Sequence, residues 1–138
     1  GALVVLDTCQ SAAHLPLDFA ALSAAGVDAM VLSSHKMLGP TGIGALVAAE
    51  DLLQAMPPVL TGGSMIEVVR MESSTYMSGP ARFEAGSQPL AQAAGWCTAL
   101  EYLSDLGMDR LHAGELDLMQ RVLDGLAALD GAPRSSCV

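Results

Sequence analysis

The most informative stretch of this chain is Met30-Val31-Leu32-Ser33-Ser34-His35-Lys36, which continues into the turn Met37-Leu38-Gly39-Pro40-Thr41-Gly42. A short apolar run that ends in a Gly/Pro turn is typical of a buried β-strand. Lys36, one of only six basic residues, follows the carboxyl end of that strand. Because burial disfavours the charged form of a lysine, we expect this amine to be used chemically. A covalent bond to an aldehyde cofactor is such a use, since it consumes the charge.

The segments around this run predict an α/β fold with a mixed sheet. Ala2 to Leu6 is a fully apolar run, as in a strand buried on both faces, and residues 16 to 25 have helical spacing that ends at Gly26. Strand, helix and strand in this order predict a right-handed crossover and a parallel pair. The run from Ile43 to Ala48 follows too short a link for a crossover, so we expect it to pair antiparallel.

The second half is predicted to be helical after one long connection. Residues 50 to 56 predict a short helix, and residues 59 to 89 contain many Gly, Ser and Pro, which predicts a long functional loop. Two helices follow, and their apolar stripes are Leu90, Ala93, Cys97, Leu100 and Leu103, and then Leu111, Leu118, Val122, Leu126 and Leu129. We therefore divide the chain into an α/β cofactor-binding segment, a helical segment of the same domain and an irregular tail, at residues 1–88, 89–130 and 131–138.

Composition narrows the classes of partner and location. Of the 138 residues 51% are hydrophobic and 4% aromatic, which suits helices packed on a sheet better than an all-β sandwich. The net charge is -9 and no basic stripe exists, so we expect neither nucleic acid nor an anionic membrane surface as partner. The three cysteines form no CxxC or Cys/His cluster, which predicts no metal site and reduced thiols in the cytoplasm. Because the chain opens on Gly1 directly before a strand, we expect it to be a piece of a longer polypeptide.

The first strand carries a carboxylate to the edge where the lysine emerges. Asp7 stands at its end, 29 residues before Lys36, and open α/β sheets bind ligands at the carboxyl ends of their strands. An acid and an amine at neighbouring strand ends are what a pyridoxal ring needs: a carboxylate on its pyridine nitrogen and a lysine on its aldehyde. Gln10 would reach the phenolic oxygen from the turn. Ser33 and His35 flank Lys36 with donors for a phosphate, and they would share one side if the segment stayed extended.

Plainer alternatives exist for each of these residues. Lys36 taken alone is a surface lysine in a turn, and Asp7 alone is a turn or N-cap residue. Ser33 and His35 alone are ordinary strand-end hydrogen-bonding groups, and Cys9 is a small buried thiol. The run from Gly39 to Gly44 is not a nucleotide phosphate loop, because it lacks the Gly-Lys-Ser/Thr ending and precedes a strand.

The motifs taken together resemble a known enzyme family. Asp7-Thr8-Cys9-Gln10, Ser33-Ser34-His35-Lys36 and Gly39-Pro40-Thr41-Gly42-Ile43-Gly44 are similar to class V, fold-type I pyridoxal-phosphate (PLP) enzymes. Pro57-Pro58, Thr61-Gly62-Gly63-Ser64-Met65-Ile66 and Arg82-Phe83-Glu84-Ala85-Gly86-Ser87 further resemble the cysteine desulfurases of the sulfur-mobilisation type, the group that includes selenocysteine lyases. The resemblance covers roughly residues 2 to 130.

The resemblance implies a fold, a cofactor and a set of roles. The fold would be part of a fold-type I PLP-transferase large domain, whose mixed, mostly parallel sheet is covered by helices. Lys36 would be the catalytic residue that bonds to PLP, Asp7 would hold the pyridinium nitrogen and Gln10 the phenolate oxygen. Ser33 and His35 would bind the phosphate. Ser87, where the family has Thr, would reach the phosphate in the partner subunit of a homodimer.

The implied activity is conversion of L-cysteine to L-alanine, with sulfur passed to an enzyme persulfide and on to an acceptor protein for iron-sulfur cluster assembly. The chain departs from the family's usual Asp-Gly-Ala-Gln and Ser-Gly-His-Lys at Thr8, Cys9 and Ser34. It also lacks the family's ring-stacking His, substrate-binding Arg and persulfide Cys, a role for which Cys137 arrives too early. Selenocysteine lyase, another class V lyase or aminotransferase, and a non-catalytic remnant or interaction module therefore stay open as alternatives, and we expect the fragment alone to be inactive.

Overall fold

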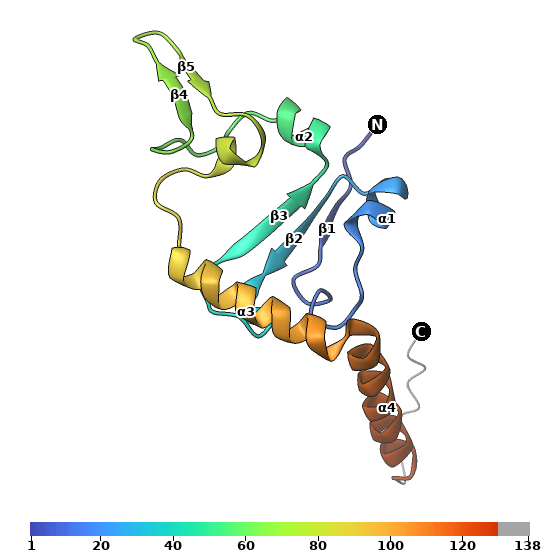
Figure 1. Cartoon of the computed structure of the whole chain (residues 1–138). Coiled ribbons are helices and arrows are strands. Elements are labelled where there is room, and N and C mark those ends of the chain that lie inside the picture. Colours follow the sequence, from blue (N-terminus) through green and yellow to red (C-terminus); the bar gives the residue numbers. More distant parts are fainter. Residues whose placement is uncertain (130–138) are drawn as a thin grey trace.

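The computed structural model of the chain describes residues 1–129 and confirms the mixed α/β fold. Its central sheet has three strands in the order β1 (Val5–Asp7), β2 (Ala29–Ser33) and β3 (Gly44–Ala48) (Figure 1). As predicted, β1 pairs with β2 in parallel and β2 pairs with β3 antiparallel. The described sheet therefore has one pair of each kind, and the change of direction falls at the turn after Lys36.

Helix α1 (Phe19–Ala24) makes the crossover between the two parallel strands. Its start is fixed by Asp18, whose carboxylate accepts from the backbone N–H of Ala20 at 2.8 Å and of Ala21 at 3.4 Å. Its end is fixed by Gly26, whose φ of +98° favours glycine. A second short helix, α2 (Glu50–Ala55), follows β3. The two signals that flank α1 explain why a segment of six residues forms a helix there.

Strand β1 is not buried on both faces, contrary to the prediction from its apolar sequence. Leu3, Val4 and Val5 are 64%, 44% and 56% exposed. Among the described residues, β1 has a neighbouring strand on one side only, and α1 is the one helix beside it in Figure 1.

The region from 59 to 89 is not a structureless loop, which corrects the prediction. It holds an antiparallel hairpin, β4 (Ile66–Val69) and β5 (Ser74–Tyr76), and a 3-10 helix, η2 (Gly79–Phe83). Figure 1 shows the hairpin extending away from the central sheet. These strands have three and four residues, and a register shift between Ile66 and Val68 interrupts the alternation that predicts a strand.

Helices α3 (Leu90–Leu106) and α4 (Met108–Ala127) form the second half, as predicted. Helix α3 runs past the end of the sheet where β2 finishes, and α4 continues beyond it after Gly107 (Figure 1). The buried core consists of Ala12, Ala13, Met37, Trp96, Ala99 and Leu103. This core lies between α3 and the segments that follow β1 and β2.

The predicted apolar stripes of the two helices match the buried residues only in part. On α3 the predicted Leu103 is buried, but so are Trp96 and Ala99, which lie outside the stripe, and Leu90 is 75% exposed. No residue of α4 is buried, although the predicted Leu111 packs against the core. The remainder of the predicted α4 stripe is exposed: Leu118, Val122, Leu126 and Leu129. Helical spacing predicted the helices correctly and the faces that they bury only in part.

Two further observations complete the description. Among residues 1–129, no helix combines the length and the apolar character that crossing a bilayer requires. The imidazole Nδ1 of His14 lies 2.6 Å from Oε1 of Glu115, which joins the segment after β1 to α4. The predicted irregular tail at 131–138, together with Cys137, lies outside the described residues.

Candidate active site

The parallel strands β1 and β2 end at one edge of the sheet, and the candidate residues follow both ends. The strand register pairs Asp7 with Val31, two residues before β2 ends at Ser33. Thr8, the residue after β1, ties this strand end to β2 and is only 4% exposed. Its backbone N–H donates to the Val31 carbonyl at 3.1 Å, and its Oγ1 donates to the same oxygen at 2.7 Å. This buried double contact fixes where Asp7 leaves the sheet.

The Asp7 carboxylate is exposed and held in its charged form. Its Oδ1 accepts a 3.0 Å hydrogen bond from the backbone N–H of Cys9. That hydrogen bond, helped by the Cys9 side chain, lowers the pKa of Asp7 below its ordinary value of 3.8. Asp7 is therefore a fixed negative charge at neutral pH, directed by the turn that follows β1.

The thiol of Cys9 links Asp7 to Lys36. Hydrogen bonding to the Asp7 carboxylate is the main cause that raises the pKa of Cys9, and partial burial and the Asp7 charge act in the same direction. The ammonium of Lys36 acts in the opposite direction and lowers that pKa. The thiol also lies 3.8 Å from the Val31 carbonyl oxygen. The pKa of this thiol therefore responds to both charges, in opposite directions.

Lys36 is exposed, which corrects the expectation of a buried amine at a strand end. After Ser33 the chain leaves the extended conformation and forms a 3-10 helix, η1 (Ser34–Lys36). This turn buries Ser34 completely and Met37 to 7% exposure, while His35 and Lys36 remain on the outside. The amine is thus presented on a short turn whose opposite side is packed.

The structure brings Ser33 and His35 together, although not by strand alternation. The segment is not extended, yet the Ser33 Oγ lies 2.8 Å from the Nδ1 of His35. His35 is exposed beside Lys36, so a hydroxyl and an imidazole stand next to the amine. Gln10 is exposed in the turn that follows β1, three positions after Asp7 in the sequence.

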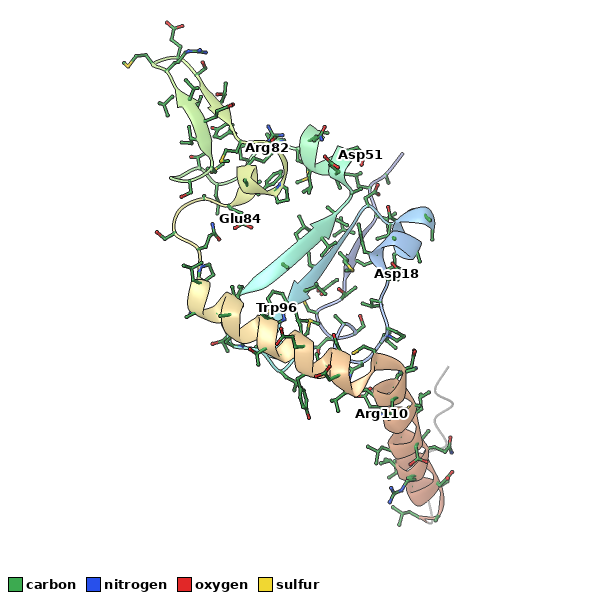
Figure 2. The ribbon with its side chains drawn as sticks, in the orientation of Figure 1. Asp18, Asp51, Arg82, Glu84, Trp96 and Arg110 are labelled. Carbon is green, nitrogen blue, oxygen red and sulfur yellow. The ribbon has the colours of Figure 1, made fainter. Side chains whose placement is uncertain are left out.

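Ser87 lies apart from these residues, in the exposed connection between η2 and α3. The preceding η2 packs beside β3, where Gly44, Leu46, Phe83 and Glu84 line a shared cleft. Arg82 anchors η2 by donating from Nη1 to the carbonyl oxygen of Gln54 at 2.9 Å, and Figure 2 shows it directed toward α2. Within this chain, Ser87 is therefore on the β3 side of the sheet and Asp7 on the β1 side.

Three residues of the site had no functional role in the sequence analysis: Thr8, Cys9 and Ser34. Cys9 was interpreted as a small buried thiol, but it is the group that both charges act on. Thr8 and Ser34 are the two buried polar residues of the described chain, and both lie beside candidate functional residues. One sequence signal could have identified Thr8 and Ser34: each is a polar residue that stands between a strand end and a candidate functional residue, where a buried hydrogen-bonding group is common.

The chain matches the family model described as Aminotransferase class-V over residues 1–136. It is 51% identical over 131 residues to "Probable cysteine desulfurase 2" of Mycobacterium leprae, and this match covers 95% of the chain and 31% of that relative. A similar structure is the cysteine desulfurase CsdA of Escherichia coli, with a TM-score of 0.86, 36% identity and coverage of 94% of the chain and 32% of CsdA.

A C-DES mutant with glycine covalently linked to its PLP cofactor is also similar in structure, with a TM-score of 0.70 and 28% identity. That match covers 91% of the chain and 34% of C-DES. The chain spans about a third of the length of the curated relatives that it matches. Because the family model covers nearly all of its residues, the chain belongs to the aminotransferase class-V family.

Proposed function

We propose that the protein containing this chain is a PLP-dependent cysteine desulfurase. One observation carries the proposal: Asp7 ends β1, and Lys36 follows the end of the adjacent parallel strand β2 on the turn η1. The likeness to relatives named as cysteine desulfurases supports the substrate, L-cysteine. In the proposed reaction the C–S bond of L-cysteine breaks, L-alanine leaves, and the sulfur atom joins an enzyme thiol as a persulfide.

The donor set at this edge fits PLP. A pyridine nitrogen stays protonated beside an ionised carboxylate, and the hydrogen bond from Cys9 lowers the pKa of Asp7 and so favours its ionised form. The amine of Lys36 is exposed, so an aldehyde can reach it from solvent. The structure of C-DES with a PLP-linked glycine supports a cofactor of this kind in the family fold.

Each side chain at the edge then has a defined task. PLP, when bound, supplies an electron sink for the substrate carbanion. Lys36 holds the cofactor aldehyde and, once substrate displaces it, carries protons at its ε-nitrogen. Asp7 holds the proton on the pyridine nitrogen, and Gln10 orients the phenolic oxygen. Ser33 and His35 bind the phosphate, for which their 2.8 Å contact already places two polar groups together.

The thiol that receives sulfur is not assigned to Cys9. A persulfide forms by attack of a thiolate, and the Asp7 carboxylate raises the pKa of Cys9, which disfavours its thiolate. We therefore propose that Cys9 is not the acceptor, and that the accepting cysteine lies in the part of the protein outside this chain, as the family resemblance implies. Sulfur transfer to a separate acceptor protein for iron-sulfur cluster assembly in the cytoplasm is part of the same proposal.

A homodimer completes the proposed site. Ser87 is exposed on the β3 side of this chain, and we propose that its hydroxyl reaches the cofactor phosphate of the partner subunit. The extended hairpin β4–β5 is consistent with a contact between subunits, because its turn residue Met71 is fully exposed and Val69 is 68% exposed.

The decisive experiment uses the full-length protein, incubated with PLP and reduced with borohydride. Lys36 is the only lysine among these 138 residues, so mapping the labelled peptide is unambiguous for this segment. We expect a yellow protein, a label on Lys36 and alanine from cysteine. Lys36→Ala should abolish alanine formation, and Lys36→Arg, which keeps the charge but lacks the nucleophilic amine, should do the same. Normal turnover in either variant would refute the assignment.

The alternatives are separated by the products. A selenocysteine lyase would release selenide from selenocysteine in preference to sulfur from cysteine, and an aminotransferase would give a keto acid in place of alanine. A non-catalytic remnant would bind PLP at Lys36 without forming any of these products.

A further inference from the structure

Helix α3 packs against the turn that carries Lys36, on the side opposite the lysine. On η1 and the residue after it, Ser34 is fully buried and Met37 is 7% exposed, whereas Lys36 is exposed. Met37 packs in the same core cluster as Trp96 of α3, which is 8% exposed. Figure 2 shows Trp96 on the side of α3 that faces the end of the sheet. The reactive amine therefore stands on a turn whose inner side is packed on a rigid helix.

Gly39 is the point where this packing is tightest. A Cβ at this position would lie 2.2 Å from the Oγ of Ser34, 3.1 Å from its carbonyl oxygen and 3.1 Å from Cδ1 of Trp96. The same carbonyl oxygen accepts from the backbone N–H of Met37 at 2.8 Å and of Gly39 at 3.0 Å. Ser34 thus fills the space that the missing side chain of Gly39 leaves open. Every other residue carries a Cβ, so this arrangement requires glycine at position 39.

The contact is steric rather than hydrogen-bonded. Within the described residues, the Oγ of Ser34 and the Nε1 of Trp96 are both buried without a hydrogen-bond partner. One residue further on, Pro40 lies close to the helix, because a Cβ on Gly95 would be 3.2 Å from its Cγ. Two glycines, one on the turn and one on α3, therefore allow the two segments to approach closely.

We propose that Ser34, Gly39 and Trp96 form a positioning cluster that fixes the direction of the Lys36 amine toward Asp7. This inference rests on the proposed function of Lys36. Because Lys36 follows Ser34 by two residues in a short 3-10 turn, a displacement of Ser34 moves the whole turn. The three residues act through packing and do not touch the reacting atoms, so they are positioning residues and not catalytic ones.

The test compares Gly39→Ala with the double variant Ser34→Gly/Gly39→Ala in the full-length protein. Gly39→Ala forces Ser34 and the turn to move, and we expect about a 100-fold loss of kcat, since a displacement near 1 Å is enough. The visible absorption of lysine-bound PLP should shift its pH midpoint, and borohydride labelling of Lys36 should fall. Removing the Ser34 side chain relieves the 2.2 Å contact, so the double variant should recover about tenfold in kcat.

Gly114→Ala on α4 is the matched control, because a Cβ there meets nothing within 4 Å. It should leave the absorption, labelling and turnover unchanged. A Gly39→Ala protein with an unaltered spectrum and normal turnover would overturn the positioning cluster. If Gly39→Ala does not fold, the double variant decides: a kcat about tenfold below wild type with weaker labelling of Lys36 supports the cluster, and wild-type turnover and labelling refute it. Failure of the proposed function itself would appear differently, as a wild-type protein that neither turns yellow nor labels at Lys36.

Discussion

The Asp7 carboxylate and the backbone N–H of Cys9 are joined by a 3.0 Å hydrogen bond at the end of β1. This bond closes the turn that begins the candidate site and holds the acid in its charged form. Since the Lys36 ammonium acts on the same Cys9 thiol, the thiol is a natural reporter of both charges. Because the two charges shift the pKa of Cys9 in opposite directions, the reactivity of this thiol can test their placement in the cofactor-free protein.

Removing the charge of Asp7 and removing the charge of Lys36 should change the reactivity of the Cys9 thiol in opposite directions. In the cofactor-free full-length protein, Asp7→Asn removes the carboxylate that raises the pKa of Cys9, so alkylation by iodoacetamide at pH 8 should become faster. Lys36→Met removes the charge that lowers this pKa, so alkylation should become slower. Mass spectrometry follows Cys9, and the exposed Cys97 serves as the internal reference. Equal rates in the three proteins would contradict the opposite effects of the two charges.

Asp7 should stay ionised to unusually low pH. Its pKa is lowered in the folded protein, so its contribution to stability is present above the ordinary value of 3.8 and is lost as pH falls through the folded pKa. The carboxyl ¹³C signal of Asp7 in the cofactor-free protein should therefore titrate with a midpoint below 3.8. The carboxylate of Glu72, which lies in the hairpin turn, is a comparison signal in the same spectrum. An Asp7 midpoint at or above 3.8 would argue against the Cys9 hydrogen bond.

Thr8→Val should destabilise the end of β1. The substitution keeps the shape of the buried side chain but removes the 2.7 Å hydrogen bond from Oγ1 to the Val31 carbonyl. We expect a loss of about 0.5–1.5 kcal/mol in the free energy of unfolding, measured with urea, because the backbone N–H of Thr8 still satisfies that carbonyl. Thr98→Val, at an exposed position of α3 where Oγ1 donates to Ala94 at 3.4 Å, should change stability less. Equal losses would show that the Thr8 contact is not special.

Trp96→Ala should be far more costly than Tyr102→Ala on the same helix. Trp96 is 8% exposed in the core cluster, whereas Tyr102 is 55% exposed. Removing the buried indole should lower the free energy of unfolding by about 3–5 kcal/mol. The exposed ring of Tyr102 should contribute about 0.5 kcal/mol or less. Comparable costs for the two variants would mean that α3 does not pack on the lysine turn through Trp96.

Much of the fold follows from local sequence. The strands before Ser33 and after Ile43 were predicted from apolar runs, and their opposite pairing from the length of the links. Both long helices were predicted from their spacing. Local sequence failed for the hairpin β4–β5, because strands of three and four residues with a register shift have no clear period. For the buried face of α3 it predicted Leu103 but missed Trp96 and Ala99.

Local sequence was enough to propose the candidate residues: one acid, one lysine and their polar neighbours, each following a short apolar run. How those groups are presented depends on the three-dimensional packing. The tertiary structure exposes Lys36 on a 3-10 turn, joins Ser33 to His35, and packs the back of that turn on α3 through Ser34, Gly39 and Trp96. The physical reason is that periodicity reports which segments become buried, whereas the direction of a side chain depends on contacts between segments that are distant in sequence.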